Sequence, residues 1–138
     1  MPPKWSAARY TYSPFQRGRR VNANQSKTSV ERYKRIGEIL VFGINHKSTT
    51  IDFREHVAFA PEVVVESLRD AVRQMPLEEA ALLSTCNRTE IYAAGDVSDE
   101  QLLEWLAANR QLQQETLQGC YYCHRGLKAL RHLMQVAS

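Results

Sequence analysis

The sequence predicts an α+β fold of the ferredoxin-like class, an antiparallel sheet with helices on one face plus an extra C-terminal helix. Three observations support this prediction. Apolar runs and amphipathic stretches follow one another in the order β-α-β-β-α-β. Only a short link separates the second and third strand-like runs, which favours an antiparallel pair. A last amphipathic stretch follows the fourth strand and adds the final helix.

The first half of this pattern begins with a buried-strand run at residues 38–45. We predict a long loop over residues 46–60. Pro61 then suits the first turn of a helix, and Pro76 ends that helix. Between the two prolines an apolar stripe recurs at helical spacing, formed by Val64, Leu68, Ala71, Val72 and Met75.

The middle of the chain holds two strands and a capped helix. Strands are predicted at residues 80–85 and 89–94, joined by a tight turn. Ser98 and Gln101 have the spacing of a capping box, in which each side chain binds the other residue's backbone amide. The helix that they open is expected to place four residues inward: Leu102, Leu103, Leu106 and Ala107.

The last part of the chain is predicted as a loop or fraying helix at residues 111–118, a strand at 119–124 and a helix at 126–138. At 100° per residue this final helix has one apolar stripe, formed by Leu127, Leu130, Leu133, Met134 and Ala137. His132 falls off the stripe. We therefore do not expect it to be a core histidine.

The chain divides into a leader of residues 1–35 and a globular domain of residues 36–138. Residues 1–37 hold nine Lys or Arg and one acid, a net charge of +8, whereas the remainder carries −5. The leader lacks hydrophobic periodicity, so we expect it to be mostly disordered. Three explanations stay open: an organelle transit peptide, a basic arm that contacts RNA phosphates, or an extension without function.

Composition sets the broad class. With 43% hydrophobic and 24% charged residues, the domain is typical of a globular protein. No apolar run approaches the roughly 18 residues of a membrane span, so we predict no membrane crossing. The odd number of cysteines and the lack of a secretory signal favour a reducing compartment. We expect no metal site at Cys120 and Cys123, because no second ligand pair accompanies them.

The segment Ser-Thr-Cys-Asn-Arg-Thr at residues 84–89 is the most informative feature for function. It places a single thiol, Cys86, in the turn between two strands. A rigid scaffold would hold this thiol while leaving it open to solvent, and Arg88 can favour the thiolate form. The residues alone leave two interpretations: a nucleophile, or a half-buried structural cysteine beside a solvated arginine.

Four separated motifs make the chain resemble the N-terminal catalytic domain of glutamyl-tRNA reductase. They are Gly-Ile-Asn-His-Lys-Ser at 43–48, Phe-Arg-Glu-His-Val-Ala-Phe at 53–59, Leu-Ser-Thr-Cys-Asn-Arg-Thr-Glu-Ile-Tyr at 83–92 and His-Leu-Met-Gln-Val-Ala-Ser at 132–138. Each motif alone is weak evidence. Their shared order and spacing are specific, and the resemblance covers residues 38–138.

The resemblance implies a reaction for Cys86. Its thiolate would attack the ester that joins glutamate to the 3′ end of tRNA and form an enzyme thioester. NADPH would then reduce the thioester to glutamate-1-semialdehyde, the first step of C5 tetrapyrrole (porphyrin and heme) biosynthesis. His132 would act in acid–base catalysis, and the alternative is an ordinary exposed histidine.

The resemblance also implies substrate-binding residues. Arg88 would grip the substrate carboxylate with Thr85 as a hydrogen-bonding partner, although Arg88 can instead pair with Glu90. Asn87 either shapes the turn or contacts the substrate. His46, at the C-terminal end of the first strand, is equally suited to binding and to anchoring a loop.

Full-length members of the family continue past the equivalent of Ser138 into a dinucleotide-binding domain and a dimerisation region. We therefore expect this chain to be an incomplete catalytic domain that cannot reduce its substrate alone, because the chain has no Gly-x-Gly-x-x-Gly sequence for NADPH. Expected partners are glutamyl-tRNA, a second subunit through the missing region, and the downstream semialdehyde aminomutase, with no DNA.

We expect a cytoplasmic location, or a plastid location if the leader is a transit peptide. The competing functional class is a non-catalytic ferredoxin-like module whose basic arm binds RNA or a protein.

Overall fold

The computed structural model describes residues 39–45, 47 and 49–138. In chain order its elements are β1 (Ile39–Ile44), α2 (Ile51–Val57), α3 (Pro61–Gln74), β2 (Leu77–Thr85), β3 (Arg88–Gly95), α4 (Asp99–Arg110), α5 (Gln114–Leu117), β4 (Tyr121–Arg125) and α6 (Leu127–Ala137). The predicted leader lies outside the described residues, and the proposed domain boundary stays a prediction. Within the described part, none of the helices combines the length and apolarity that spanning a bilayer requires.

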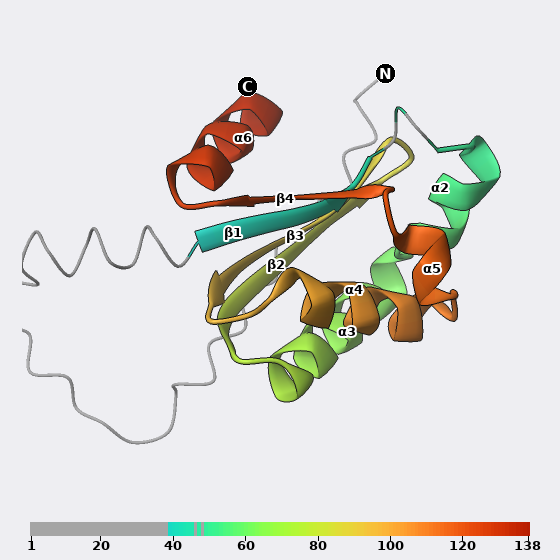
Figure 1. Cartoon of the computed structure of the whole chain (residues 1–138), viewed down its shortest axis with the longest axis horizontal. Coiled ribbons are helices and arrows are strands. Elements are labelled where there is room, and N and C mark those ends of the chain that lie inside the picture. The colour runs from blue at the N-terminus through green and yellow to red at the C-terminus, as the bar shows by residue number, and fades with distance from the viewer. Residues whose placement is uncertain (1–38, 46, 48) are drawn as a thin grey trace, which may run out of the picture.

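The described strands form one antiparallel sheet in the order β2-β3-β1-β4 (Figure 1). β1 is central and pairs with β3 on one side and β4 on the other. β2 and β3 form the hairpin predicted from their short link. This strand order, with α3 and α4 as the two crossovers, is the ferredoxin-like arrangement. The predicted fold class is therefore confirmed.

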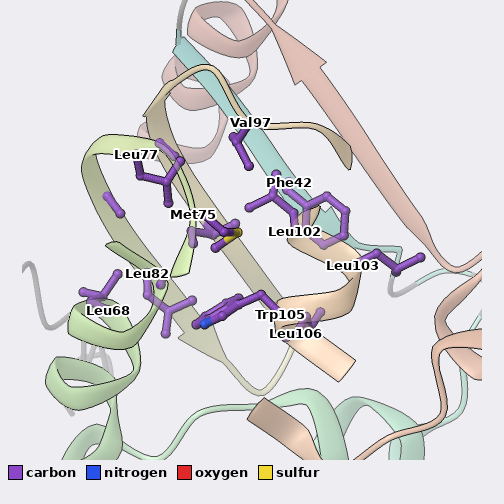
Figure 2. Packing of buried hydrophobic residues seen from close by; sticks show 14 of the residues in the cluster. Phe42, Leu68, Met75, Leu77, Leu82, Val97, Leu102, Leu103, Trp105 and Leu106 are labelled. Atoms are coloured by element: carbon purple, nitrogen blue, oxygen red, sulfur yellow. The ribbon is translucent and has the colours of Figure 1, made fainter. Parts of the chain in front are cut away.

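The hydrophobic core lies between the sheet and the pair α3 and α4, which cover one of its faces (Figures 1 and 2). Leu68 of α3 and Leu102 of α4 are fully buried there, as the helical periodicity predicts. Trp105 also points inward, stacks on Phe59 and donates from its indole N–H to Asp70. Burial of this apolar surface is the main source of stability for the sheet.

The predicted helix ends of α3 and α4 are also present. Pro61 occupies the first turn of α3. Ser98 accepts a hydrogen bond from the Gln101 amide at 3.2 Å, and Gln101 Oε1 accepts one from the Ser98 amide at 3.0 Å. Both bonds of the capping box therefore form and satisfy amides that the first turn leaves unpaired.

The predicted loop over residues 46–60 is wrong at Ile51–Val57, which forms helix α2. Thr50 caps this helix, because its hydroxyl accepts a hydrogen bond from the Phe53 amide at 3.3 Å. Only Val57 of the helix is fully buried. A helix that buries a single residue has no apolar stripe, so hydrophobic periodicity does not reveal it.

A smaller correction concerns the start of β2. β2 begins at Leu77, three residues before the predicted start, and its exposed Glu78 and Glu79 lie on an edge strand. Charged side chains are common on such edges because they discourage pairing with other chains. The segment predicted as loop or fraying helix contains the short helix α5, which Leu117 anchors in the core.

α6 lies on the face of the sheet opposite α3 and α4, where it contacts β1 and β4 (Figure 1). The orientation predicted from its apolar stripe is wrong, because Leu127, Leu133 and Met134 are exposed. Ala129 is buried instead, and His132 faces the sheet. The small side chain of Ala129 allows the helix to approach the strands, and a buried carboxylate on β3 provides a partner for His132.

Candidate active site

Cys86 occupies the tip of the hairpin between β2 and β3. Thr85 and Arg88 are the last paired residues, so Cys86 and Asn87 alone make the turn. Neither residue has a positive φ, and the turn is therefore not of type I′ or II′. The Asn87 amide donates a hydrogen bond to Thr85 Oγ1 at 3.3 Å, which stabilises the turn. The thiol is exposed to solvent.

A pocket of about 320 Å³ opens beside this thiol, on the face of the sheet that α3 and α4 cover. Cys86 and Thr85 form one rim, while α2 and the start of α3 form the opposite wall. Ser84 Oγ accepts a hydrogen bond from the Phe59 amide at 2.8 Å and so ties the α2–α3 connection to β2. We refer to this space as the Cys86 pocket. Its lining combines apolar side chains with the charged Arg54 and Glu55 of α2.

On the opposite face, five residues form the Glu90 cluster: Glu90, Arg88, Tyr92, Tyr122 and His132. Glu90 on β3 is completely buried. Its Oε1 accepts hydrogen bonds from Arg88 Nη1 and His132 Nε2, each at 2.7 Å, and from the Tyr122 hydroxyl. Its Oε2 accepts from the Tyr92 hydroxyl. The buried charge is paired and fully hydrogen-bonded, as a stable interior carboxylate must be.

The surroundings of Glu90 act on its pKa in opposite directions. Burial alone would raise the pKa of the carboxyl, but the hydrogen bonds of the cluster outweigh it and hold the pKa below the ordinary value of 4.5. Burial and the bond to the carboxylate raise the pKa values of both tyrosines. Glu90 is therefore an anion at neutral pH and both tyrosine hydroxyls stay protonated donors.

We expect the stability of the domain to fall in acid because of Glu90. Its pKa is lower in the folded than in the unfolded chain, so its contribution is complete above about pH 4.5 and is lost as the pH falls through the folded pKa. Urea unfolding at a series of pH values between 7 and 3 measures this loss. A Glu90→Gln variant should lack that part of the pH dependence, and an identical dependence in both proteins would contradict the expectation.

Gly43 of β1 makes room for the Glu90 cluster. It pairs with Glu90 on β3 and with Tyr122 on β4, so it lies between the two residues on this face of the sheet. A Cβ atom at this position would lie 2.5 Å from the Tyr122 ring and 2.9 Å from Cγ of Glu90. Any larger residue would therefore push the tyrosine away from the carboxylate.

Gly43→Ala is expected to lower the free energy of unfolding by about 1–3 kcal/mol, because the added methyl group overpacks the contact with Tyr122. Urea denaturation measures the change. Combining Gly43→Ala with Tyr122→Ala supplies the control, since removal of the ring should abolish most of the penalty of the glycine substitution. If Gly43→Ala alone were as stable as the original protein, Tyr122 would not limit the size of the residue at position 43.

Three aromatic rings pack together beside the carboxylate. The ring centroids of Tyr122, His124 and His132 lie 5.3–5.5 Å apart in all three pairs. His132 is thus held by one hydrogen bond and two ring contacts, which fix the orientation of its imidazole. Because an ionised carboxylate can only accept, Nε2 of His132 is the protonated nitrogen when the ring is neutral, and Nδ1 is the basic one.

The structure groups the predicted site residues into two sets. Arg88 and His132 meet at Glu90, while Thr85, Cys86 and Asn87 form the hairpin turn. Thr85, Asn87 and Arg88 also line a small cavity behind the turn. Arg88 pairs with Glu90, which is the alternative to substrate binding that the sequence left open. Glu90 is buried, however, so this is not a surface ion pair. His46 lies outside the described residues.

Sequence reasoning did not recognise the central role of Glu90, nor the tyrosines that bind it. Arg88, Glu90 and Tyr92 alternate along β3 and therefore share one face. The sequence does show Glu90 within a strand-like run. A carboxylate in a strand needs hydrogen-bonding partners if its face of the sheet is covered, so Glu90 was the signal that could have revealed the cluster. The tyrosine and histidine of β4 gave no comparable signal, since an exposed sheet face would carry them equally well.

The other cysteines differ from Cys86 in their surroundings. Cys123 is half-buried on β4, and burial together with its hydrogen bond to Asp99 raises the pKa of its thiol to about 12. This thiol stays protonated at neutral pH and is a poor nucleophile. Cys120 precedes β4, and its carbonyl accepts a hydrogen bond from the Asn45 amide at 2.6 Å. No cluster of metal-ligating side chains is present among residues 39–45, 47 and 49–138.

The fold and this arrangement define an α+β domain with an exposed cysteine at a hairpin turn and with a histidine and an arginine held by a buried carboxylate. Comparison with known proteins identifies the family. A profile described as "Glutamyl-tRNAGlu reductase, N-terminal domain" matches residues 42–138. The chain therefore belongs to the glutamyl-tRNA reductase N-terminal domain family, as its motifs predict.

Individual relatives agree with this assignment. The chain is 49% identical over 100 residues to glutamyl-tRNA reductase of Stutzerimonas stutzeri, covering 72% of this chain and 24% of that protein. It is 46% identical over 99 residues to the Ectopseudomonas mendocina reductase, covering 71% and 23%. The solved glutamyl-tRNA reductase of Methanopyrus kandleri superimposes with a TM-score of 0.52 at 29% identity, over 73% of this chain and 22% of that one. The chain thus spans about a quarter of the length of the curated relatives it matches.

Proposed function

We propose that this chain performs the acyl-transfer step of a glutamyl-tRNA reductase, in which a glutamyl group passes from tRNA to Cys86. The observation that carries the proposal is the exposed thiol at the turn between β2 and β3, four residues before Glu90 of β3. Membership of the reductase family supports glutamyl-tRNA as the substrate. No redox chemistry is needed for this step.

In the proposed reaction the Cys86 thiolate attacks the carbonyl carbon of the ester between glutamate and the tRNA ribose. A carbon–sulfur bond forms and the carbon–oxygen bond to the ribose breaks. The ribose oxygen leaves with the electron pair and takes up a proton. The product is a thioester, which stays activated toward later attack at the same carbon.

His132 is the proposed acid–base group of this step. Its Nε2 donates to Glu90, which leaves Nδ1 to receive a proton from the thiol and return it to the leaving ribose oxygen. Arg88 Nη1 and His132 Nε2 contact the same carboxylate oxygen, so the imidazole lies beside the guanidinium. Arg88 in turn is two residues from Cys86 in the sequence. Glu90 orients both groups without itself reacting.

Arg88 is the proposed carboxylate-binding residue. It uses Nη1 to bind Glu90, and the other N–H groups of its guanidinium are proposed to hold the side-chain carboxylate of the glutamyl group. Thr85 and Asn87 are proposed to contribute polar contacts from the turn. The two histidines differ in support: His132 has defined partners, whereas for His46 substrate binding and loop anchoring both stay predictions.

Reduction requires a hydride, which NADPH supplies in the proposed full reaction. The residues of this chain do not fit that cofactor, because the sequence lacks the glycine-rich turn that binds a dinucleotide. Reduction to glutamate-1-semialdehyde is therefore assigned to a complete reductase. Dimerisation, transfer of the product to an aminomutase, and a cytoplasmic or plastid location stay predictions.

Incubation of the chain with tRNA carrying radiolabelled glutamate tests the proposal. We expect label on the protein in a form that hydroxylamine releases, as a thioester would be. Added NADPH should give no semialdehyde with this chain. Unlabelled protein would contradict the acyl-transfer proposal, and semialdehyde formation would contradict the assignment of reduction to other parts of the enzyme.

A further inference from the structure

Helix α6 leaves an apolar stripe on the surface of the domain. Leu127, Leu133 and Met134 expose 72%, 40% and 64% of their surface. Leu127 and Met134 also line, with Leu130, one shallow hollow along the helix. The opposite side of α6 packs on β1 and β4. Single exposed apolar residues are ordinary, but a contiguous group of them marks an interaction site.

The charged residues beside this stripe are basic. At 100° per residue, Lys128 and Arg131 follow the stripe on one flank, and both are exposed. Neither forms an ion pair with another described residue. The 11 residues of α6 include no Asp or Glu. An apolar stripe with basic neighbours and no acid is typical of helices that lie on an anionic membrane surface.

The basic leader joins the domain at the start of α6. Residues 1–37 hold nine Lys or Arg and one acid, a net charge of +8, and the described chain begins at Ile39. The Ile39 carbonyl accepts a hydrogen bond at 2.8 Å from the amide of Gly126, the residue directly before α6. Figure 1 shows the start of β1 beside the turn that leads from β4 into α6. The positive charge of the leader is therefore attached next to the exposed stripe.

The charge and the apolarity of this surface together favour one occupant. A second copy of the chain would bring like charges together, because both helices and both leaders are basic. An RNA would satisfy the cations, but single-stranded RNA is bound through aromatic stacking, which aliphatic side chains do not supply. An anionic bilayer has charged headgroups directly above an apolar layer, and so matches both the cations and the stripe.

We propose that α6 docks this chain on an anionic lipid bilayer, with its stripe among the acyl chains nearest the headgroups and its cations on the headgroups. In this position the helix lies along the membrane surface. His132 still faces the sheet, so docking leaves the Glu90 cluster as it is. Docking is also independent of the proposed acyl transfer. Because the attraction between the cations and the headgroups is electrostatic, it weakens as salt is added.

Sedimentation with lipid vesicles measures the docking. The full chain is mixed with vesicles of phosphatidylcholine and phosphatidylglycerol in equal amounts, and with vesicles of phosphatidylcholine alone. We expect binding to the anionic vesicles only, and less binding at high salt. Leu127→Ser combined with Met134→Ser should lower the partition coefficient by about tenfold or more. Ile51→Ser combined with Val63→Ser, which removes two exposed apolar residues elsewhere, is the matched control and should bind like the unchanged chain.

A second pair of variants tests the charges. Lys128→Gln combined with Arg131→Gln should lower binding to the anionic vesicles by about tenfold. The control is Arg69→Gln combined with Arg73→Gln, which removes two exposed cations from α3. No binding, equal binding to both kinds of vesicle, or equal effects of the α6 variants and their controls would overturn the assignment of α6 as the docking surface.

A spin-labelled lipid locates the contact without any substitution. It should broaden the NMR signals of Leu127, Leu133 and Met134 and leave that of Val63 unchanged, and broadening confined to other residues would contradict the docking. Rival occupants give different results. If the unchanged chain ignores vesicles, but binds RNA or associates with itself in a way that the α6 serine variants weaken, the surface belongs to RNA or to a second copy and the lipid assignment fails.

Discussion

Cys86→Ser is expected to lower the rate of glutamyl transfer to the protein by about a thousandfold or more. A serine hydroxyl is a far weaker nucleophile at neutral pH than a thiolate, and its oxygen ester would not be activated in the same way. The side chain is exposed at a turn, so the free energy of unfolding should change by less than about 0.5 kcal/mol. The rate is measured from the radiolabel retained by the protein.

Cys123→Ser provides the matched control for this prediction. The Cys123 thiol is half-buried and stays protonated, so its replacement should leave the rate of transfer unchanged. If the Cys123 variant lost the label and the Cys86 variant kept it, the acyl acceptor would be Cys123. That result would contradict the proposed chemistry.

Glu90→Gln is expected to produce the largest loss of stability. The substitution keeps the volume of the side chain but removes the charge that binds Arg88 and His132. Breaking a buried ion pair in this way costs on the order of 3 kcal/mol, because the remaining charge loses its partner. The free energy of unfolding, measured in urea at pH 7, should fall by about that amount.

The same substitution should also slow acylation of Cys86 by about a hundredfold, since His132 would lose the bond that fixes its proton-accepting nitrogen. Glu104→Gln, on the exposed surface of α4, is the control for removing one negative charge. A Glu90 variant that unfolds and reacts like the Glu104 variant would show that the buried carboxylate positions nothing. Reduced stability with unchanged acylation would leave Glu90 with a purely structural role.

The regular elements of the fold were predictable because they bury one face. β1 is a continuous apolar run in the sequence because neighbouring strands and both layers of helices cover it. In each of the crossover helices α3 and α4, the apolar stripe and the residues at the helix start predict the same helix. The short helix α2 was not predictable in this way, because it buries only Val57 and depends on the local cap at Thr50.

The orientation of α6 shows where periodicity misleads. The widest apolar stripe of this helix, which includes Leu127 and Met134, is exposed in the described part of the chain. The helix instead turns Ala129 and His132 toward the sheet, because Glu90 requires a partner there. Hydrophobic periodicity considers only which residues of one helix are apolar. It therefore cannot predict that a helix turns a polar residue toward a buried charge on another element.

The candidate site was predictable in part. The exposed thiol and its flanking polar residues stand out in the sequence because an ordinary turn does not use them. The Glu90 cluster joins β3, β4 and α6, and the hydrogen-bonded pair Glu90 and His132 is separated by 42 positions. No local pattern connects positions so far apart. The Cys86 pocket likewise depends on α2, which the sequence did not reveal.

The most direct measurement locates the acyl group itself. The unmodified chain is incubated with glutamyl-tRNA, quenched in acid and digested, and the peptides are analysed by mass spectrometry. We predict a glutamyl group on the peptide that contains Cys86, and unmodified peptides for Cys120 and Cys123. A glutamyl group on either of those residues, or on none of the three, would contradict the assignment of Cys86 as the acyl acceptor.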